Sequence, residues 1–391
     1  MDAYILSAAR TPIGKFLGDL SDLPAPRLGA VAVAAAIHRA GVAPDQVDEV
    51  ILGNVVQAGV GQAPARQAAL FAGLPDTIAA YTVNKVCGSG LKAVMLAAQA
   101  IKAGDARIVV AGGMESMSNT PFLLPGVRKG YKYGDQKTVD ALVHDGLWCP
   151  FENCAMGDSA DYIAAKYAVS RADQDRFSAQ SHRRAAAAWD RSDFAAEVVP
   201  VTVGTGAKAR TVSRDEGIRA DSTPDGLARL RPAFKPDGTV TAGNASQLSD
   251  GAAALVVASQ VAADQFGTKP LARVVAYATS GVPPKDIFIA PVSAVRMVLE
   301  KAKLVMGDID LFELNEAFAA QMLACGKELG LDEAKVNVNG GAIALGHPIG
   351  ASGARALTTL VYALQTRGLR YGLASLCLGG GNAVAMIVER T

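Results

Sequence analysis

The 391-residue sequence has no excess of charge of either sign and no long apolar run. Lys and Arg number 38 and Asp and Glu 37, so the formal net charge is +1 and no overall field attracts nucleic acid or an anionic membrane. No apolar stretch approaches the ~20 residues that a membrane span needs. The first residues enter a strand-like run at once, without the basic flank and apolar core of a signal peptide. We therefore expect a soluble, cytoplasmic protein with no nucleic-acid or membrane partner.

Cysteine is scarce too, and no zinc-type Cys-x-x-Cys pair is present. The five cysteines are Cys87, Cys149, Cys154, Cys325 and Cys377. An odd number without such a pair is typical of free thiols in a reducing compartment. The sequence therefore predicts no metal site, and no role is evident for Cys149 and Cys154.

What the sequence does contain is an alternation of strand-like and helix-like segments. Half of the residues are apolar and 19% are charged, as in a folded globular protein. Strands are expected at 3–9, 47–56, 80–86 and 108–111, and helices at 28–40, 64–72 and 91–103. Strands that alternate with helices predict an α/β fold with a largely parallel sheet.

The second half of the chain repeats the organisation of the first. Asn54 precedes Cys87 by about as many residues as Asn315 precedes His347. In each half a glycine-rich turn, a helix and a buried strand follow. This repetition predicts a duplicated α/β unit, with Cys87 and His347 at matching junctions between a loop and a helix.

Three domains follow from this pattern. Residues 1–120 form the N-terminal α/β half, completed by about 240–270, and residues 271–391 form the C-terminal half. Residues 121–239 interrupt them as an inserted loop domain, which is polar and rich in glycine at 125–146. Long loops in compact domains are often lids or binding segments.

His347 is the one ionisable residue in the glycine-rich stretch 339–353. Glycine costs ~0.5–1 kcal/mol relative to alanine inside a helix or strand, so this stretch predicts a loop. A histidine on a rigid loop is a candidate proton carrier, since its ordinary pKa of ~6.5 lies near working pH. The alternative is a tight turn with an incidental histidine.

Cys87 lies where a strand becomes a helix, in the sequence Asn-Lys-Val-Cys-Gly-Ser-Gly. Backbone N–H groups at a helix start lower the pKa of a thiol, so the position favours a nucleophile. The alternative is a small buried apolar residue.

Two further sites carry reactive groups near predicted strand ends. Cys377 precedes three glycines, whose N–H groups are suited to bind an oxyanion. Asn315 and Glu316 lie at a strand-to-helix junction, where helix capping is the alternative role.

Four blocks resemble the signature sequences of the thiolase family, in the family's order and spacing: residues 84–90, 315–318, 341–353 and 377–383. Residues 7–14 and 241–246 are similar to that family as well, so the resemblance covers essentially the whole chain. It implies two duplicated βαβαβαββ units, packed as a layered α-β-α-β-α core with an inserted loop domain.

The resemblance also implies catalytic roles. Cys87 would be the nucleophile that takes an acyl group from coenzyme A, and His347 would activate it and stabilise charge on the substrate oxygen. Cys377 would be the acid/base at the α-carbon of the second thioester. Asn315, through a water, and His347 would form one oxyanion site, and the N–H groups of Cys87 and Gly379 the other. Acyl transfer needs a nucleophile and carbon–carbon bond formation needs a base, which explains two thiols.

Substrate-binding positions carry over from the same resemblance. Arg219 would pack against the adenine of coenzyme A and Ser246 would lie near the pantetheine amide. Ala317 and Phe318 would line the pantetheine tunnel, with Leu147 beyond. Arg219 as a solvated surface charge and Phe318 as a core residue are the alternatives. Coenzyme A thioesters are substrates in this interpretation, and no resident cofactor is expected.

Two positions depart from the family pattern. Ala155 stands where many members have a histidine, which removes a polar contact from the acyl pocket. Ile287, in the loop 286–291, stands where bacterial acetyl-transferring members often have Met-Gly. This loop is more similar to mitochondrial-type acetoacetyl-CoA thiolases, some of which accept 2-methyl-branched substrates and bind potassium. The bulk of Ile287, Phe288 and Ile289 in this loop predicts a preference for short acyl chains.

The expected reaction is the reversible condensation of two acetyl-CoA molecules to acetoacetyl-CoA and coenzyme A, through an acyl-cysteine intermediate. A 3-ketoacyl-CoA thiolase of broader range, from fatty acid β-oxidation, is the main alternative. A decarboxylating condensing enzyme is disfavoured by Cys377, and a scaffold that only binds acyl-CoA is disfavoured by the retained catalytic groups. The segment 125–146 has too few apolar residues for a core of its own. In this family such a segment contributes to tetramer contacts, so a homotetramer is expected.

Overall fold

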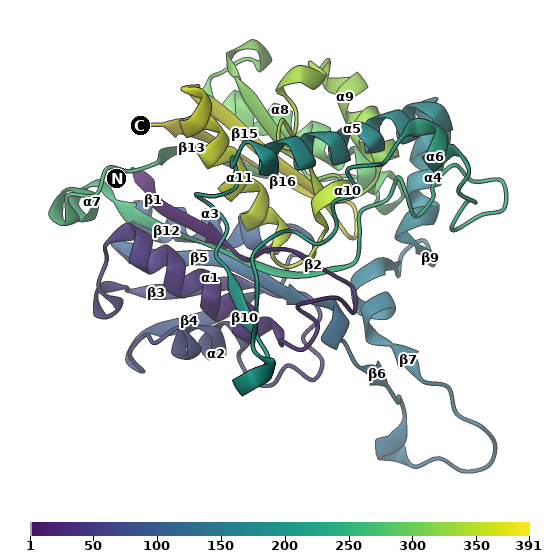
Figure 1. The fold of residues 1–391 in the computed structure, drawn as a ribbon, viewed down its shortest axis with the longest axis horizontal. Coiled ribbons are helices and arrows are strands. Elements are labelled where there is room, and N and C mark those ends of the chain that lie inside the picture. The colour runs from purple at the N-terminus through teal and green to yellow at the C-terminus, as the bar shows by residue number, and fades with distance from the viewer. Residues whose placement is uncertain (1) are drawn as a thin grey trace.

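A ten-stranded mixed sheet runs through the computed structural model, which describes residues 2–391 (Figure 1). The strands follow the order β14-β15-β16-β13-β1-β12-β5-β3-β4, and β2 pairs with β12. The N-terminal half contributes β1 (Ala3–Arg10), β2 (Gly14–Lys15), β3 (Glu49–Gly53), β4 (Ala79–Val83), β5 (Ile108–Ser116) and β12 (Ser249–Ser259). The C-terminal half contributes β13 (Ala272–Gly281), β14 (Leu311–Leu314), β15 (Tyr371–Leu378) and β16 (Asn382–Arg390).

The two halves have the same spatial order of strands, which confirms the predicted duplication. The order β1-β12-β5-β3 in one half corresponds to β13-β16-β15-β14 in the other. The halves meet where Tyr4 and Ile5 of β1 pair with Arg273 and Ala272 of β13. The loop-to-helix junction with Cys87 lies in the N-terminal half, and the junction with His347 lies in the C-terminal half.

The prediction of a largely parallel sheet was wrong. Only β3–β4, β3–β5 and β14–β15 are parallel among the strand pairs of the described sheet, and the others are antiparallel. Parallel pairs need a helical crossover. By contrast, β15 and β16 form an antiparallel hairpin through the glycines 379–381. Strand β12, which follows the insertion, runs antiparallel to both of its neighbours, β1 and β5.

Helices form three layers around the two halves of the sheet. The outer layer on the N-terminal half holds α1 (Ala25–Ala40) and α2 (Pro64–Phe71), and the outer layer on the C-terminal half holds α8 (Ala290–Ala302) and α9 (Ala319–Leu329). The middle layer holds α3 (Ser89–Ala103) and α11 (Ser352–Arg367), which share one buried apolar core with strands of both halves. The result is the α-β-α-β-α arrangement. Among residues 2–391, no helix is long and apolar enough to span a bilayer.

Glycines allow the starts of α3 and α11 to touch. A Cβ atom at Gly353 would lie 2.4 Å from the backbone nitrogen of Leu91, and one at Gly90 would lie 2.8 Å from that of Ala354. Real Cβ atoms do not approach backbone so closely, so larger residues would push the helices apart. This contact brings together the two loops that carry Cys87 and His347.

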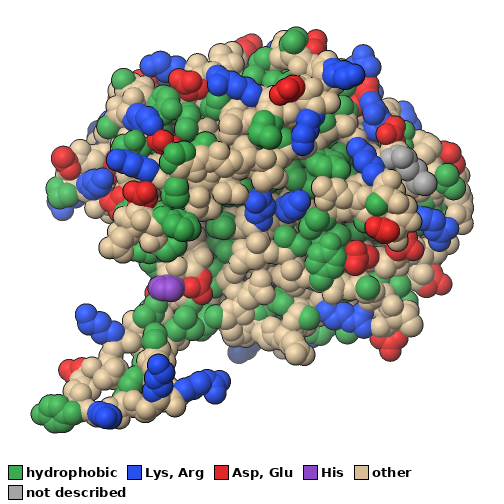
Figure 2. All heavy atoms as spheres, turned by 180° about the vertical axis from the view of Figure 1, so that it is seen from behind, with side chains coloured by type: hydrophobic (Ala, Val, Ile, Leu, Met, Phe, Trp, Pro, Cys, Tyr) green, Lys and Arg blue, Asp and Glu red, His purple; other side chains and the backbone are tan. Residues whose placement is uncertain are grey.

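The segment between β5 and β12 covers the outside of this core (Figure 1). Its helices are α4 (Met156–Lys166), α5 (Arg171–Asp190) and α6 (Pro224–Ala228), and α4 and α5 both pack against α9. Its strands form three small ribbons: β6 (Phe122–Leu123) with β7 (Val139–Asp140), β8 (Trp148–Cys149) with β9 (Cys154–Ala155), and β10 (Val201–Val203) with β11 (Arg210–Val212). The β6–β7 ribbon and its loop project from the body of the molecule, as Figure 2 shows from behind.

Two short α-helices complete the described elements, α7 (Gln260–Phe266) and α10 (Ala342–Leu345). The remaining helical turns are 3-10 or π turns at Pro44–Gln46, Met117–Asn119, Val127–Lys129, Leu142–Leu147, Gly206–Lys208, Pro284–Ile289, Met306–Asp308 and Glu333–Lys335.

Candidate active site

A cavity of about 470 Å³ lies where the Cys87 and His347 loops meet the end of β15. The walls are mostly apolar, and three groups capable of chemistry face into it, namely Cys87, His347 and Cys377. Of the positions predicted to bind substrate, the lining includes Leu147, Ser246, Ile287, Ala317 and Phe318. An apolar cleft with a few convergent reactive groups is the usual form of an enzyme active site.

Cys87 occupies the tight turn between β4 and α3, directly after Val86, whose φ is 46°. Its own N–H and that of Gly379 hydrogen-bond the sulfur and lower the thiol pKa, but burial has the larger effect and raises this pKa to about 12. The prediction that a helix start lowers the pKa of this thiol was therefore wrong in net direction, because desolvation outweighs the two N–H groups. A base must take the proton before Cys87 can act as a nucleophile.

His347 is held in its neutral form, which is the form that can accept a proton. Burial lowers its pKa to about 3, with a smaller contribution in the same direction from the positive charge of Arg355. Nδ1 lies 2.6 Å from the Ser352 hydroxyl, which donates its own proton to the Pro348 carbonyl at 2.9 Å. Because the hydroxyl has only one proton, Nδ1–H must donate to Ser352. Nε2 is then the unprotonated nitrogen of the ring.

Asn315 contacts that second nitrogen. Its Nδ2 lies 3.4 Å from Nε2 of His347, and its Oδ1 has no hydrogen-bond partner although the residue is buried. Asn315 does not itself line the cavity, which places its amide behind the histidine. An unpaired buried acceptor is unusual, and a bound water would satisfy it.

The neighbouring Glu316 does not cap α9, the helix that follows it in the sequence. Its carboxylate accepts hydrogen bonds from the Ser181 hydroxyl at 2.7 Å, from Asn337 Nδ2 at 2.9 Å and from the Ile343 N–H at 3.1 Å. Helix α9 begins only at Ala319. Glu316 instead fastens the loop before His347 to α5.

Cys377 is the next-to-last residue of β15 and is 2% exposed. Burial raises the pKa of this thiol well above its ordinary value, and the nearby Cys87 and Cys325 sulfurs act in the same direction. The uncharged thiol is thus the resting form. Cys377 can serve as a proton donor first and as a base only after it has lost that proton.

Among the positions predicted to bind substrate, Arg219 is the one that the structure does not bring to the cavity lining. Its side chain is exposed, and its backbone N–H donates to Nδ1 of His182 at 3.1 Å. Burial, together with the charge of Arg219, lowers the pKa of His182 to about 4.

Sequence reasoning missed several residues of the site. Phe234 lines the cavity and lies edge-on to Phe318 at 6.4 Å, and Phe318 in turn packs against Phe288 at 5.1 Å. Gly157 permits this arrangement, since a Cβ atom there would lie 2.1 Å from the Phe234 ring. Phe234 follows Ala233 in the charged part of the insertion, with no periodic pattern to mark it.

Glu115 is a second residue that the sequence did not identify. It is 1% exposed and accepts hydrogen bonds from Asn54 Nδ2 at 2.7 Å and from the N–H groups of Val55, Val56 and Gly350 at 3.0, 3.3 and 2.9 Å. Burial raises its pKa to about 8, against the effect of those N–H groups. Glu115 thus joins the N-terminal half to the loop that carries His347.

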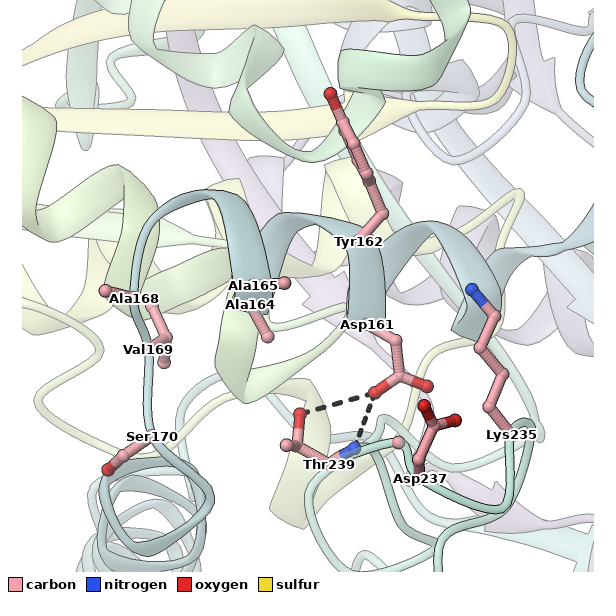
Figure 3. Close-up of a pocket in the computed structure, with 11 residues that line it drawn as sticks. Asp161, Tyr162, Ala164, Ala165, Ala168, Val169, Ser170, Lys235, Asp237 and Thr239 are labelled. Atoms are coloured by element: carbon pink, nitrogen blue, oxygen red, sulfur yellow. Dashed lines mark hydrogen bonds between the residues drawn. The ribbon is translucent and has the colours of Figure 1, made fainter.

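A second, more open cavity of about 650 Å³ lies between α4 and the loop 235–239 (Figure 3). The carboxylate of Asp161 accepts from the Thr239 N–H at 2.7 Å, the Thr239 hydroxyl at 3.3 Å and the Val240 N–H at 3.0 Å. Lys235 and Asp237 lie at its exposed side. The contacts of Asp161 tie α4 to this loop. Within residues 2–391, no cluster of three His, Cys, Asp or Glu side chains is arranged to hold a metal ion.

Comparison with known proteins agrees with this geometry. The model of the thiolase N-terminal domain matches residues 3–261, and that of the thiolase C-terminal domain matches residues 268–390. Acetyl-CoA acetyltransferases of Chromobacterium violaceum and Escherichia coli are 55% and 54% identical to the chain, and each alignment covers 100% of it and at least 99% of the relative. The crystal structure of the Bacillus anthracis acetyl-CoA acetyltransferase superposes with a TM-score of 0.98 at 44% identity, covering 100% of this chain and 99% of that one. The chain belongs to the thiolase family.

Proposed function

We propose that the protein catalyses the reversible condensation of two acetyl-CoA molecules to acetoacetyl-CoA and coenzyme A. The observation that carries this proposal is the convergence of Cys87, His347 and Cys377 on one apolar cavity. The names of the relatives from C. violaceum and E. coli support the acetyl group as the transferred unit.

The first half-reaction follows from the protonation states. Neutral His347 takes the Cys87 proton through Nε2, and the thiolate attacks the carbonyl carbon of the first acetyl-CoA. The N–H groups of Cys87 and Gly379, which already face the Cys87 sulfur, are suited to receive the developing oxyanion. Cys377 gives its proton to the departing coenzyme A thiolate. Acetyl-Cys87, protonated His347 and the Cys377 thiolate remain.

The second half-reaction uses these products. The Cys377 thiolate removes a proton from the α-carbon of a second acetyl-CoA, while protonated His347 and the Asn315 amide, with a water, stabilise the enolate oxygen. The enolate carbon attacks the acetyl group on Cys87 and forms the new carbon–carbon bond. The Cys87 thiolate leaves and recovers its proton from His347, so every group returns to its starting state. Thiolysis of acetoacetyl-CoA is the same sequence in reverse.

Binding of coenzyme A would use the apolar walls of this cavity. Ser246 lies beside Ala317, to whose carbonyl its N–H donates at 3.0 Å, and Phe318 follows directly. This places a polar group and an aromatic face along one side of the cavity for the pantetheine arm. Arg219 is proposed to contact the adenine from the exposed side of the insertion. Coenzyme A thioesters act as substrates, and no resident cofactor is proposed.

The protein is further proposed to be a cytoplasmic homotetramer. The β6–β7 ribbon and its loop expose a group of large apolar side chains that a monomer would leave in water: Phe122, Leu124, Val127, Tyr131 and Tyr133. Light scattering at micromolar concentration tests the assembly, and a monomer there would rule it out.

The activity itself is tested by thiolysis of acetoacetyl-CoA with coenzyme A, followed by release of acetyl-CoA. Turnover that disappears in Cys87→Ala supports the proposal. A purified, folded protein that binds acetyl-CoA without turnover would make it a binding scaffold instead.

A further inference from the structure

Two cysteines that the proposed reaction does not use lie opposite each other in a short hairpin. Strands β8 and β9 pair antiparallel, and the register sets Trp148 against Ala155 and Cys149 against Cys154. Residues 150–153 form the loop between them and are all exposed. Both thiols are free.

This register suits a disulfide without movement of the backbone. Directly opposed residues in an antiparallel pair have Cα atoms ~4.5–5.5 Å apart and side chains on the same face of the ribbon. Disulfides span Cα separations of ~4.4–6.8 Å. The Cys149–Cys154 pair therefore meets the distance requirement through its strand pairing alone.

The two thiols differ in access, which gives each a separate role. Cys149 is 2% exposed, whereas Cys154 is partly exposed and its sulfur lies 3.5 Å from the Ser159 hydroxyl. An oxidant in solution can reach Cys154 first. Cys149 needs no access of its own, because its target is the sulfur directly across the ribbon.

The hairpin is continuous with the wall of the active-site cavity. Leu147 immediately precedes β8, Ala155 ends β9 and Met156 follows, and all three line the cavity. At the tip, a Cβ atom added to Gly380 would lie 3.3 Å from the Phe151 ring, so the loop rests beside the glycines that follow Cys377. A bond across the ribbon would therefore fix one wall of the cavity in place.

We propose that Cys149 and Cys154 form a dithiol that a low-molecular-weight disulfide oxidises to an intramolecular disulfide. The Cys154 thiolate attacks one sulfur of the oxidant and releases one thiol, which leaves a mixed disulfide on Cys154. The Cys149 thiolate then attacks the Cys154 sulfur and releases the second thiol. The protein loses two electrons and two protons, and the oxidant is reduced to two thiols.

Peptide mapping of the native protein after treatment with oxidised glutathione tests this proposal. Trypsin cleaves after Lys137 and Lys166, so both cysteines fall in one peptide, while Cys87 and Cys377 fall in others. The expected result is a 138–166 peptide that lacks two hydrogen atoms and resists alkylation at both cysteines. Treatment with a dithiol reductant should restore both alkylations. A peptide that stays fully alkylated, or that carries glutathione on one cysteine without closing, would overturn the proposal.

Two single variants distinguish formation of the Cys149–Cys154 disulfide from reaction of one cysteine alone with glutathione. Cys149→Ser should leave Cys154 with a stable glutathione adduct, because the second thiol is gone. Cys154→Ser should leave the buried Cys149 largely unmodified. Equal labelling of the remaining cysteine in both variants would contradict the assigned order of attack.

Thermal unfolding tests for the disulfide independently of peptide mapping. A short closed loop restricts the unfolded chain, so oxidation should raise the Tm of the native protein by roughly 1–4 °C and leave Cys149→Ser unchanged. Since the strand pairing already holds both residues, the oxidised hairpin should keep its shape. A fall in Tm on oxidation, seen only in the protein with both cysteines, would contradict a disulfide that fits the native hairpin.

Discussion

The Ser352 hydroxyl accepts a hydrogen bond from Nδ1 of His347 at 2.6 Å, and this single contact fixes which nitrogen of the ring is free. Ser352 opens α11 and reaches back to the Pro348 carbonyl. The start of one helix thus sets both the position and the tautomer of the proposed base.

Ser352→Ala should lower the rate of Cys87 acylation roughly 10–100-fold, because a buried Nδ1–H without a partner costs ~1–3 kcal/mol and the wrong tautomer becomes accessible. Ser178→Ala is a matched control, since that buried hydroxyl also donates to a carbonyl four residues earlier in a helix, at 2.8 Å, but does not touch His347. Single-turnover acylation measures the effect. Equal rates in both variants would show that Ser352 does not act through the histidine.

Glu115→Ala should destabilise the fold by about 3 kcal/mol or more, because it leaves four buried donors without an acceptor. Glu115→Gln should cost less, since it keeps an acceptor oxygen and resembles the protonated acid that the raised pKa favours. Denaturant unfolding compares the two with Glu333→Ala, whose side chain is 46% exposed and pairs with Arg176 at the surface. Equal unfolding free energies of the Ala and Gln variants would contradict the proposal that the Glu115 hydrogen bonds hold the N-terminal half to the loop that carries His347.

The lowered pKa of His347 predicts a pH dependence with a definite sign. The folded state keeps the ring neutral down to pH about 3, whereas the unfolded chain binds a proton near its ordinary pKa of ~6.5. The unfolded state thus holds more protons between these values, and the stability contributed at neutral pH is lost as pH falls through this window. Relative to His347→Gln, the native protein should therefore lose unfolding free energy from pH ~6.5 downward.

The pH dependence of the Cys87 acylation rate tests the lowered pKa of His347 kinetically. The acylation rate should show no loss attributable to protonation of the base between pH ~8 and ~5, since a base of lowered pKa stays neutral there. An acid limb with an apparent pKa near 6.5 would contradict the assignment.

Chain-length preference should depend on Ile287, which is 2% exposed and lines the cavity beside Phe288. The native protein should use acetoacetyl-CoA with the highest kcat/KM and a ~10-carbon 3-ketoacyl-CoA much less well, while Ile287→Ala should shift the ratio toward the longer chain roughly 10-fold. Ile51→Ala controls for loss of core packing, because that buried residue lies away from the cavity. A native preference for the long chain would favour the broader-range alternative.

Local sequence pattern predicted the loop-to-helix junctions at Cys87 and His347, whereas the proposed catalytic roles of these residues came from the family resemblance. Cys87 and His347 each follow a strand or loop and precede a helix, and these positions depend on glycines that the sequence displays. Helix α1 was expected to begin at Leu28 and begins at Ala25, since Pro26 is tolerated in a first turn.

Contacts between residues far apart in the sequence could not be predicted from local pattern. Glu115 meets Gly350 only because the two halves pack against each other, and Asn315 meets His347 only through the tertiary packing of the C-terminal half. The pKa of Cys87 was misjudged for the same reason, since the local helix start was visible in the sequence but the burial was not. The direction of β12 depends on the path by which the inserted segment leads back to the sheet. The pattern of apolar residues in the sequence does not show that path.

The central claim is that Cys87 carries the acyl group while Cys377 only moves protons. Cys377→Ala keeps Cys87, His347 and the Gly379 N–H in place, so radiolabelled acetyl-CoA should still leave one acetyl group per subunit at the end point, although more slowly because the Cys377 proton is missing. Condensation and thiolysis should fall ~10²–10⁴-fold, as expected for loss of a positioned acid/base. Cys325→Ala, which removes a neighbouring buried thiol on α9, should leave both activities largely intact.

The decisive measurement is therefore acetyl labelling against turnover in Cys377→Ala, with circular dichroism to verify the fold. We predict retained labelling with turnover almost abolished. Loss of labelling in a folded Cys377→Ala protein, or labelling and turnover that fall in proportion, would contradict the division of roles between the two thiols.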